Sequence, residues 1–271
     1  MVDLAPAEQA GTPLRVGVVG AGFAGAAAAV LLARDGHHVT VYEEALDPRP
    51  IGAGILLQPT GMVALEQLGI AETILRLGSP VDSLRVETAS GFCLMHLDYR
   101  RLGPGVIGVG LHRGALFQAL FDLMLAEAPR LELRLGVSIV GQQRDPASGE
   151  RLLRDRDGAL HGPHDLTVVA DGSRSLVRET LHTLRPRRRE YPWGALWFIG
   201  DDPDQVAGRR LYQRVRGARF MAGILPTGYG PEPRPHDAPW LQAAGKPGTS
   251  AHREHSAAPA PPPPPPPPPI P

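Results

Sequence analysis

Three glycines near the amino terminus have the spacing that a phosphate-binding turn requires. Gly20, Gly22 and Gly25 form a G-x-G-x-x-G pattern within the segment VGVVGAGFAG. The first glycine permits a tight turn, the second lets a pyrophosphate approach the backbone, and the third lets a helix pack closely on a strand. The N–H groups and the positive dipole end of that helix would face the phosphates. The candidate contacts are the residues of the turn: Gly20, Ala21, Gly22, Phe23, Ala24 and Gly25.

A carboxylate follows the glycines at the sequence spacing that is typical of a dinucleotide site. The segment HHVTVYEE has the pattern of a strand, and Glu43 stands at its end, 18 residues after Gly25. A carboxylate there can accept hydrogen bonds from both hydroxyls of an adenosine ribose, and it would repel a 2′-phosphate. Glu44 is the nearby alternative, but its side chain would face the other side of the strand. The sequence therefore predicts a dinucleotide site in which Glu43 binds the ribose.

The elements that position these residues follow from the hydrophobic pattern. Residues 14–19 have the pattern of a strand, 23–34 of a helix and 39–42 of a second strand. Strand–helix–strand order indicates α/β layers with a parallel sheet. The 18 uncharged residues 16–33 also reach the length of a membrane span. They are mostly Ala and Gly, with four glycines among them, so we expect a nucleotide-binding turn and no membrane span.

Further segments have helical or strand patterns. Helices are expected over 60–68 and 115–126. Strands are expected over 84–88, 92–98, 131–135, 137–143 and 166–170. A turn at 156–158 is expected to join 151–154 and Leu160 in a hairpin.

Composition narrows the class of protein. The 271 residues include 28 Lys and Arg and 28 Asp and Glu, so there is no excess charge for binding nucleic acid. Cys93 is the single cysteine, which fits a reducing compartment, so we expect a cytoplasmic protein with Cys93 buried as a small apolar residue. His161 and His164 have no partners at metal-ligand spacing, so we expect surface histidines and no metal site.

The carboxyl-terminal segment differs from the rest in composition. Residues 226–271 contain 17 prolines, nine of them consecutive at 261–269. Proline lacks a backbone N–H, and few large apolar residues are present to offset the entropy of ordering the chain. We expect a disordered tail over 231–271; the alternative interpretation is a proline-rich ligand for an aromatic groove.

Four segments, in this order, carry a further signal: VGVVGAGFAGAAAAVLLARDGHHVTVYEEA, IGAGILLQPTGMVALEQLGI, VGLHRGALFQAL and DLTVVADGSRSLVRETL. Together they resemble the FAD-dependent aromatic-ring monooxygenases of the p-hydroxybenzoate hydroxylase type. The later segment RFMAGILPTGYG resembles a strand of that family's substrate sheet. The combination is far more specific than a glycine triplet alone.

The resemblance implies further cofactor contacts. Gly54 matches a loop beside the flavin, Arg113 an arginine against FAD, and Asp171-Gly172 a motif near the pyrophosphate. From the residues alone, Asp171 either ends a strand at the ligand-binding edge of the sheet or is a helix cap in an ordinary turn. Arg113 either is a solvated arginine or, as a cation at a helix start, indicates a bound anion.

The chain departs from the family pattern after the fourth segment. The family's second Gly-Asp motif is absent, because Gly200-Asp201 is followed by Asp202-Pro203. The family's later strands and helices have no counterpart either, so a truncated or frame-shifted reading is one hypothesis. The flavin ring would then lack one wall, and we expect weak or no retention of FAD.

These observations define the expected α/β architecture, a Rossmann-like FAD/NAD(P)-binding fold with an incomplete β-sheet substrate domain and a disordered Pro-rich tail. The expected parts are an FAD-binding domain over 1–181 with a β excursion at 80–109, a partial substrate-binding region over 182–230, and the tail over 231–271.

The resemblance implies hydroxylation of an aromatic or similar apolar small molecule with NAD(P)H and O₂, by a form that truncation could leave inactive. No residue pattern identifies a catalytic acid or base. Two alternatives stay open: another flavin-dependent oxidoreductase of the same fold, and a non-catalytic interaction protein that uses the tail. The substrate, the choice between NADH and NADPH, and the oligomeric state do not follow from the sequence.

Overall fold

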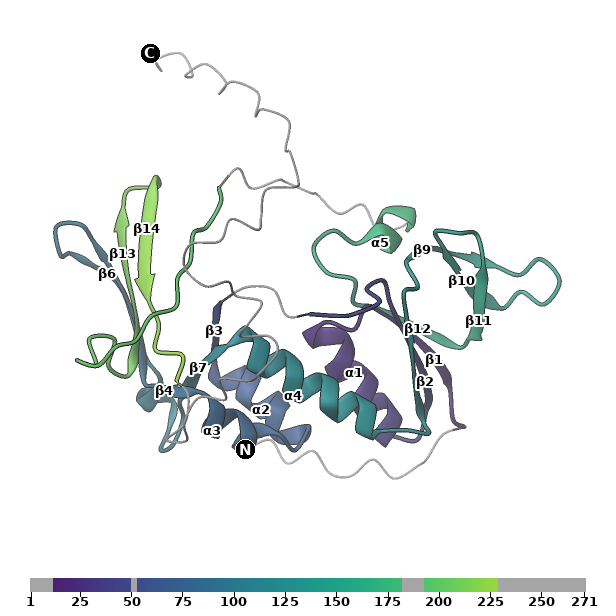
Figure 1. The fold of residues 1–271 in the computed structure, drawn as a ribbon, viewed down its shortest axis with the longest axis horizontal. Helices are drawn as coiled ribbons and strands as arrows, with labels where there is room; N and C mark the ends of the chain where they lie inside the picture. Colours follow the sequence, from purple (N-terminus) through teal and green to yellow (C-terminus); the bar gives the residue numbers. More distant parts are fainter. Residues whose placement is uncertain (1–11, 50–52, 182–192, 229–271) are drawn as a thin grey trace, which may run out of the picture. The chain divides into compact units, whose positions relative to one another are not determined.

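The structure, a computed structural model, describes residues 12–49, 53–181 and 193–228 (Figure 1). All of them belong to one compact unit, Met1–Pro233. The expected tail over 231–271 lies outside the described residues, so its predicted disorder stays a prediction.

A four-stranded parallel sheet forms the centre of the amino-terminal region. In spatial order its strands are β12 (Leu166–Val169), β1 (Arg15–Val19), β2 (His38–Glu43) and β8 (Leu131–Leu135). Four of the five residues of β1 are buried, because its valines pack well on a sheet covered on both faces. Strand β1 lies between β2, which follows it, and β12, which comes much later in the chain. Open α/β sheets bind ligands at such a change of direction, beyond the carboxyl ends of the strands.

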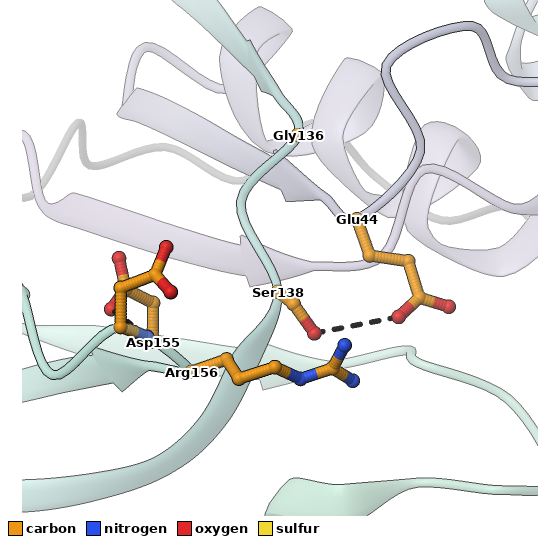
Figure 2. Close-up of a pocket in the computed structure, with 6 residues that line it drawn as sticks. Glu44, Gly136, Ser138, Asp155 and Arg156 are labelled. Atoms are coloured by element: carbon orange, nitrogen blue, oxygen red, sulfur yellow. Dashed lines mark hydrogen bonds between the residues drawn. The ribbon is translucent and has the colours of Figure 1, made fainter.

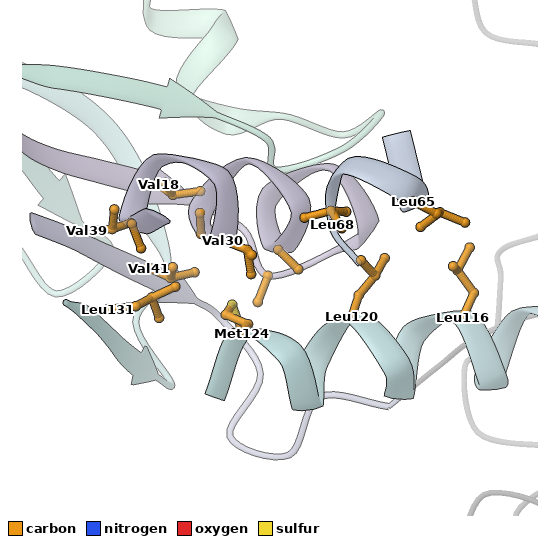
Figure 3. Packing of buried hydrophobic residues seen from close by; sticks show 14 of the residues in the cluster. Val18, Val30, Val39, Val41, Leu65, Leu68, Leu116, Leu120, Met124 and Leu131 are labelled. Atoms are coloured by element: carbon orange, nitrogen blue, oxygen red, sulfur yellow. The ribbon is translucent and has the colours of Figure 1, made fainter. Parts of the chain in front are cut away.

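Two helices cover one face of this sheet. Helix α1 (Phe23–Arg34) joins β1 to β2, and helix α4 (Arg113–Ala126) precedes β8. The small Ala and Gly residues of α1 allow close packing, and Gly36, with a φ of 93°, turns the chain toward β2. Figure 3 shows the apolar core between these helices and the strands. The core residues labelled there are Val18, Val30, Val39, Val41, Leu65, Leu68, Leu116, Leu120, Met124 and Leu131.

A β-meander and a short helix cover the other face. The meander consists of β9 (Ile139–Arg144), β10 (Arg151–Asp155) and β11 (Leu160–His164), and the helix is α5 (Leu176–Thr180). Their apolar side chains form a second, smaller cluster with the sheet, made of Val19, Tyr42, Ile139, Leu153 and Val177. The amino-terminal region therefore has three layers.

The remaining described strands form two more sheets. The smaller is antiparallel and has the order β3 (Gly54–Leu57), β7 (Gly108–His112) and β4 (Ser79–Val81). It accompanies helices α2 (Pro59–Gln67) and α3 (Ala71–Leu77) and the 3-10 helix η1 (Tyr99–Leu102). The larger, which we call the mixed sheet, has the order β14 (Phe220–Ile224), β13 (Arg210–Arg216), β5 (Ser83–Thr88) and β6 (Cys93–Asp98).

One face of the mixed sheet, which we call its apolar face, carries most of its apolar side chains. Register pairs Tyr212 with Arg85 on one face, and Gln213 with Val86 and Val86 with Met95 on the other. The apolar side chains that register places on this second face are Leu84, Val86, Met95, Leu97, Leu211, Val215 and Met221. Although Val86 is buried, Met95 and Met221 on the outer strands are 48% and 59% exposed.

The strand–helix–strand unit is confirmed, with the helix at the expected residues Phe23–Arg34. The uncharged segment 16–33 is divided between β1 and α1, and no described helix is long and apolar enough to cross a membrane. The hairpin around 156–158 is also present, as β10 and β11. Strands β3 and β7 were not expected, because their segments GILL and GVGLH are short and contain glycine, which is depleted in strands.

Two expectations about exposure are wrong. Cys93 is exposed rather than buried, because it begins β6, an edge strand with exposed residues along most of its length. His164 is buried rather than at the surface. Its ring lies against Gly17 of β1, where a side chain would leave no room for it.

Candidate functional site

The turn between β1 and α1 needs each of its three glycines for a different reason. Gly20 has a φ of 95°, and a Cβ there would lie 2.7 Å from the backbone oxygen of Ala170. A Cβ on Gly25 would overlap the backbone oxygen of Gly20. At Gly22, by contrast, no described atom lies within 4 Å of the Cβ position. The turn is therefore tight on the protein side and open at Gly22.

The open side of the turn coincides with the start of α1. Gly22 is the N-cap of this 12-residue helix, and no side chain in the described part of the chain caps it. The first N–H groups of a helix lack intrahelical partners and favour a negative charge. This geometry fits a pyrophosphate group placed against Gly22.

Glu43 lies at the same turn. The backbone N–H of Ala21 donates to Oε2 of Glu43 (2.8 Å), and the N–H of Ala45 donates to Oε1 (3.0 Å). Each carboxylate oxygen has a second lone pair, so both can still accept a hydrogen bond from a ribose hydroxyl. Two backbone donors therefore fix Glu43 beside the turn while leaving it able to bind a ligand.

Glu44 points elsewhere, toward a separate polar cavity shown in Figure 2. The hydroxyl of Ser138 donates to Oε2 of Glu44 at 3.4 Å, which is a long hydrogen bond. The cavity measures about 330 Å³ and is lined by Glu44, Gly136, Ser138, Asp155, Arg156 and Asp157. Of the two adjacent carboxylates, the structure brings Glu43 to the glycine turn.

Arg113 joins the turn from helix α4. Its guanidinium carbon lies 5.5 Å from the ring centroid of Phe23, the first residue of α1. Its Nε is buried and has no hydrogen-bond partner among the described residues. An unpaired buried donor is costly, and so is a cation at the amino end of a helix. A bound anion would relieve both costs, so Arg113 fits a phosphate-bearing cofactor.

His112, which the sequence did not single out, fixes the start of α4. Its Nδ1 accepts a hydrogen bond from the N–H of Gly114 (3.0 Å) and so caps the helix that begins with Arg113. Burial lowers the pKa of His112, which favours the neutral ring that this cap requires. A histidine directly before the expected arginine was the available sequence signal, but histidine is not among the common N-caps.

Asp171 and Gly172 come shortly after β12, and the backbone of Asp171 lies against the glycine turn. The Cα of Asp171 lies 3.1 Å from the Cβ position of Gly20. Gly172 has a φ of 81° and is exposed. Asp171 is not the cap of the next helix, because Ser175 accepts the N–H of Arg178 (3.0 Å) in that role. The alternative interpretation of Asp171 as a helix cap is therefore wrong.

Gly54 is packed against other residues of the protein, from strand β7 and from the segment after β14. It pairs with His112 in the small sheet, and the N–H of Arg113 donates to the backbone oxygen of Ala53 (2.8 Å). A Cβ on Gly54 would lie 2.9 Å from Cγ2 of Thr227. Glycine is thus required here for packing, whichever ligand lies nearby. In the described ranges no cluster of three or more His, Cys, Asp or Glu is placed to hold a metal ion.

Residues 13–229 match the family model described as FAD binding domain. The chain belongs to the FAD binding domain family. The resemblance noted in the sequence is thereby confirmed, as are FAD as the family's cofactor and the α/β fold with a parallel sheet.

Several named relatives of this FAD binding domain chain are hydroxylases or monooxygenases. It is 29% identical over 217 residues to 3-hydroxybenzoate 6-hydroxylase of Klebsiella oxytoca, covering 78% of this chain and 49% of that protein. It is 30% identical over 244 residues to 3-amino-4-hydroxybenzoate 2-monooxygenase of Streptomyces cremeus, covering 83% and 59%. The crystal structure of P. aeruginosa PqsL with 2-aminobenzoylacetate matches with a TM-score of 0.61 and 29% identity, covering 80% and 59%. The chain spans about half the length of the curated relatives that it matches.

Proposed function

We propose that this chain binds FAD at the glycine turn and serves the NAD(P)H- and O₂-dependent hydroxylation of a small aromatic or similar apolar molecule. The family match and the names of the relatives, which include hydroxybenzoate hydroxylases, support the reaction class. The observation that carries the binding site is the buried Nε of Arg113, which has no partner among the described residues and lies beside Phe23 at the start of α1.

In this proposal the pyrophosphate of FAD lies against the turn and the start of α1. Arg113 donates to a phosphate oxygen through the Nε that lacks a partner among the described residues. Glu43 accepts the ribose hydroxyls, Asp171 and Gly172 border the pyrophosphate, and Gly54 lies on the flavin side. The backbone contacts come from the turn, Gly20, Ala21, Gly22, Phe23, Ala24 and Gly25.

FAD supplies the redox chemistry that uses NAD(P)H and O₂, and the protein binds and orients it and limits access of water. We assign no residue of this chain a catalytic acid or base role. The substrate is proposed only as a class, a small aromatic or similar apolar molecule.

We also propose that the part of the chain at 80–109 belongs functionally with residues 182–230, as the substrate-binding side of the molecule. Parallel pairing of β5 with β13 supports this grouping, because it joins strands from the two segments in one sheet. A cytoplasmic location is proposed from the single cysteine, and cell fractionation would test it.

Titration of the full chain with FAD, followed by flavin fluorescence, tests the binding site. FAD is expected to bind, ADP to compete with it and FMN, which lacks the adenosine half, to compete poorly. Arg113→Gln is expected to weaken FAD binding about 10- to 100-fold, since it removes a charge-assisted hydrogen bond. The exposed Arg101→Gln is the matched control and should change nothing. Equal affinity of Arg113→Gln and the unmodified protein would contradict the assigned site.

The reaction is tested separately, with FAD added to the assay because weak retention through purification is expected. A panel of hydroxybenzoates is supplied with NADH or NADPH and with ¹⁸O₂. Incorporation of one ¹⁸O atom into an aromatic product is expected. Oxidation of the nicotinamide that yields hydrogen peroxide with every aromatic compound would favour a different flavin-dependent activity.

A further inference from the structure

A buried polar cluster lies behind the glycine turn, between the parallel sheet and the meander. The hydroxyl of Tyr42 on β2 is 3.0 Å from Nε2 of His164 on β11, and the two residues are 2% and 6% exposed. The Tyr42 ring also contacts the ring of His161, with centroids 5.2 Å apart. Nε2 of His161 is 2.8 Å from Oδ2 of Asp155. Burying polar groups is unfavourable unless they are paired, and an apolar pair would fill the same space without that cost.

Strand β1 has a glycine, and therefore no side chain, at the position where this cluster packs against it. A Cβ on Gly17 would lie 2.7 Å from Cδ2 and 2.9 Å from Nε2 of His164. A glycine inside a strand weakens it and marks a close approach of another group. Here that group is the ring of His164. Four strands thus contribute to the cluster or make room for it: β1, β2, β10 and β11.

Tyr42 connects this cluster to the proposed cofactor site through its own backbone. The N–H of Gly20 donates to the backbone oxygen of Tyr42 (2.8 Å). The next residue, Glu43, accepts the N–H of Ala21. The backbone oxygen of Tyr42 therefore binds the glycine turn, and its phenol oxygen is hydrogen-bonded to His164.

We propose that Tyr42 and His164 are positioning residues for the cofactor: their hydrogen bond fixes the end of β2, and with it Glu43 and the glycine turn, in the geometry that binds the adenosine half of FAD. This inference rests on the proposed FAD binding. Neither side chain touches the cofactor site directly, so the effect passes through the backbone of β2.

The hydrogen bond depends on the protonation of His164. In a neutral ring whose Nε2 is unprotonated, Nε2 accepts the phenol O–H of Tyr42. A protonated ring has no acceptor there and donates from Nε2 to the phenol oxygen instead, so the phenol proton must turn away from His164 and a buried positive charge appears. The pKa of His164 is lowered by burial and further by Arg15 and Arg134, against the opposite effect of Asp165. The arrangement in which Tyr42 donates to His164 is therefore available at neutral pH and is lost in acid, where the bond reverses and the buried site holds a charged ring.

Charged and titratable groups surround this bond on every neighbouring element. Arg15 comes from β1, Glu132 and Arg134 from β8, Asp155 from β10, and His161 and Asp165 from or beside β11. Arg134 also lies over the ring of Tyr42, 5.8 Å from its centroid. The two arginines are fixed cations in this pH range, so they oppose a second positive charge at His164.

The test is the FAD affinity of the full chain by flavin fluorescence from pH 8 to pH 5.5, in the unmodified protein and in Tyr42→Phe and His164→Gln. The unmodified protein is expected to lose affinity as the pH falls below about 6.5, the usual pKa of histidine. Tyr42→Phe should bind about 2- to 10-fold more weakly at pH 8, the effect of one net hydrogen bond. His164→Gln should make the pH profile shallower, with the remaining slope due to His112, which caps the helix of Arg113. His96→Gln, at an exposed histidine of β6, should leave the profile unchanged.

Thermal unfolding of each variant without FAD separates positioning from a purely structural role. If Tyr42→Phe and His164→Gln lower the unfolding temperature but keep the FAD affinity and its pH profile, the positioning role is overturned while FAD binding stands. If the unmodified protein binds no FAD at pH 8, the proposed function and this inference both fail.

Discussion

The parallel sheet and the mixed sheet are stabilised by different interactions. Val18, in the centre of the parallel sheet, is fully buried, and helices and a meander cover the two faces of that sheet. On the apolar face of the mixed sheet, Met95 and Met221 are about half exposed. An ion pair joins the starts of its two central strands: Arg209, directly before β13, donates twice to Asp82, directly before β5, at 2.8 Å. The parallel sheet therefore has the larger and better covered apolar core, although exposed ion pairs, such as Arg15 with Asp165, occur there too.

The largest difference is expected from matched leucine truncations. Leu120→Ala, in the core between α4 and α1, should lower the free energy of unfolding by about 2–5 kcal/mol, because it leaves a cavity. Leu97→Ala, at a position 39% exposed on β6, should cost less than about 1 kcal/mol. Urea denaturation followed by circular dichroism measures both. Equal losses would mean that the mixed sheet is as well packed as the parallel one.

Two glycine variants separate stability from binding within the cofactor turn. Gly25→Ala forces a Cβ onto the backbone oxygen of Gly20, so we expect a loss of about 1–3 kcal/mol in stability together with loss of FAD binding. Gly22→Ala meets no described atom within 4 Å, so its stability should stay within about 0.5 kcal/mol while FAD binding falls roughly tenfold. Gly200→Ala, which also meets open space among the described residues, is the control and should change neither.

Mild acid should affect the parallel-sheet region first. Burial lowers the pKa of His112 below that of the unfolded chain, so its stabilising cap on α4 is fully present above about pH 6.5 and weakens as the pH falls below it. Loss of an N-cap costs about 0.5–2 kcal/mol. His112→Asn keeps a capping side chain without a titrating ring, so the fall in unfolding temperature between pH 7.5 and pH 5.5 should shrink. If His112→Asn leaves this fall in unfolding temperature unchanged, groups other than His112 cause it.

High salt should give the smallest effect and act on the mixed sheet. At 1 M salt the screening length is about 3 Å, which weakens exposed ion pairs such as Arg209–Asp82 by up to about 1 kcal/mol. Amide hydrogen exchange is expected to accelerate in β5 and β13 and to stay unchanged in β2, whereas β1 has an exposed ion pair of its own at Arg15. Asp82→Asn at low salt should reproduce the faster exchange in the mixed sheet. Equally faster exchange in β2 would remove the distinction between the two sheets.

Local patterns sufficed to predict the centre of the parallel-sheet region. The valines of β1, the glycine spacing and the Ala-rich helix α1 lie in one short stretch, so their periodicity is visible without knowledge of the rest. The family resemblance then indicated Arg113, which the structure brings to the glycine turn. That position stays a prediction as a cofactor contact, as do Glu43 and Asp171.

What the sequence did not reveal depends on contacts between distant residues. His164 is buried because Gly17, on a different strand, leaves room for its ring. Gly54 faces Thr227, and no local pattern around either residue indicates that contact. Cys93 is exposed because β6 lies at the edge of its sheet, and edge position is a property of the whole topology.

The position of β12 beside β1 has a consequence for the synthesis of the protein. Val16 pairs with Leu166, and the backbone oxygen of Ala170 forms one side of the turn at Gly20. A ribosome adding roughly 5–20 residues per second needs on the order of ten seconds to reach β12 after making β1. During that interval the nascent chain carries the glycine turn with only one of its two neighbouring strands, and cofactor capture has to wait for the second.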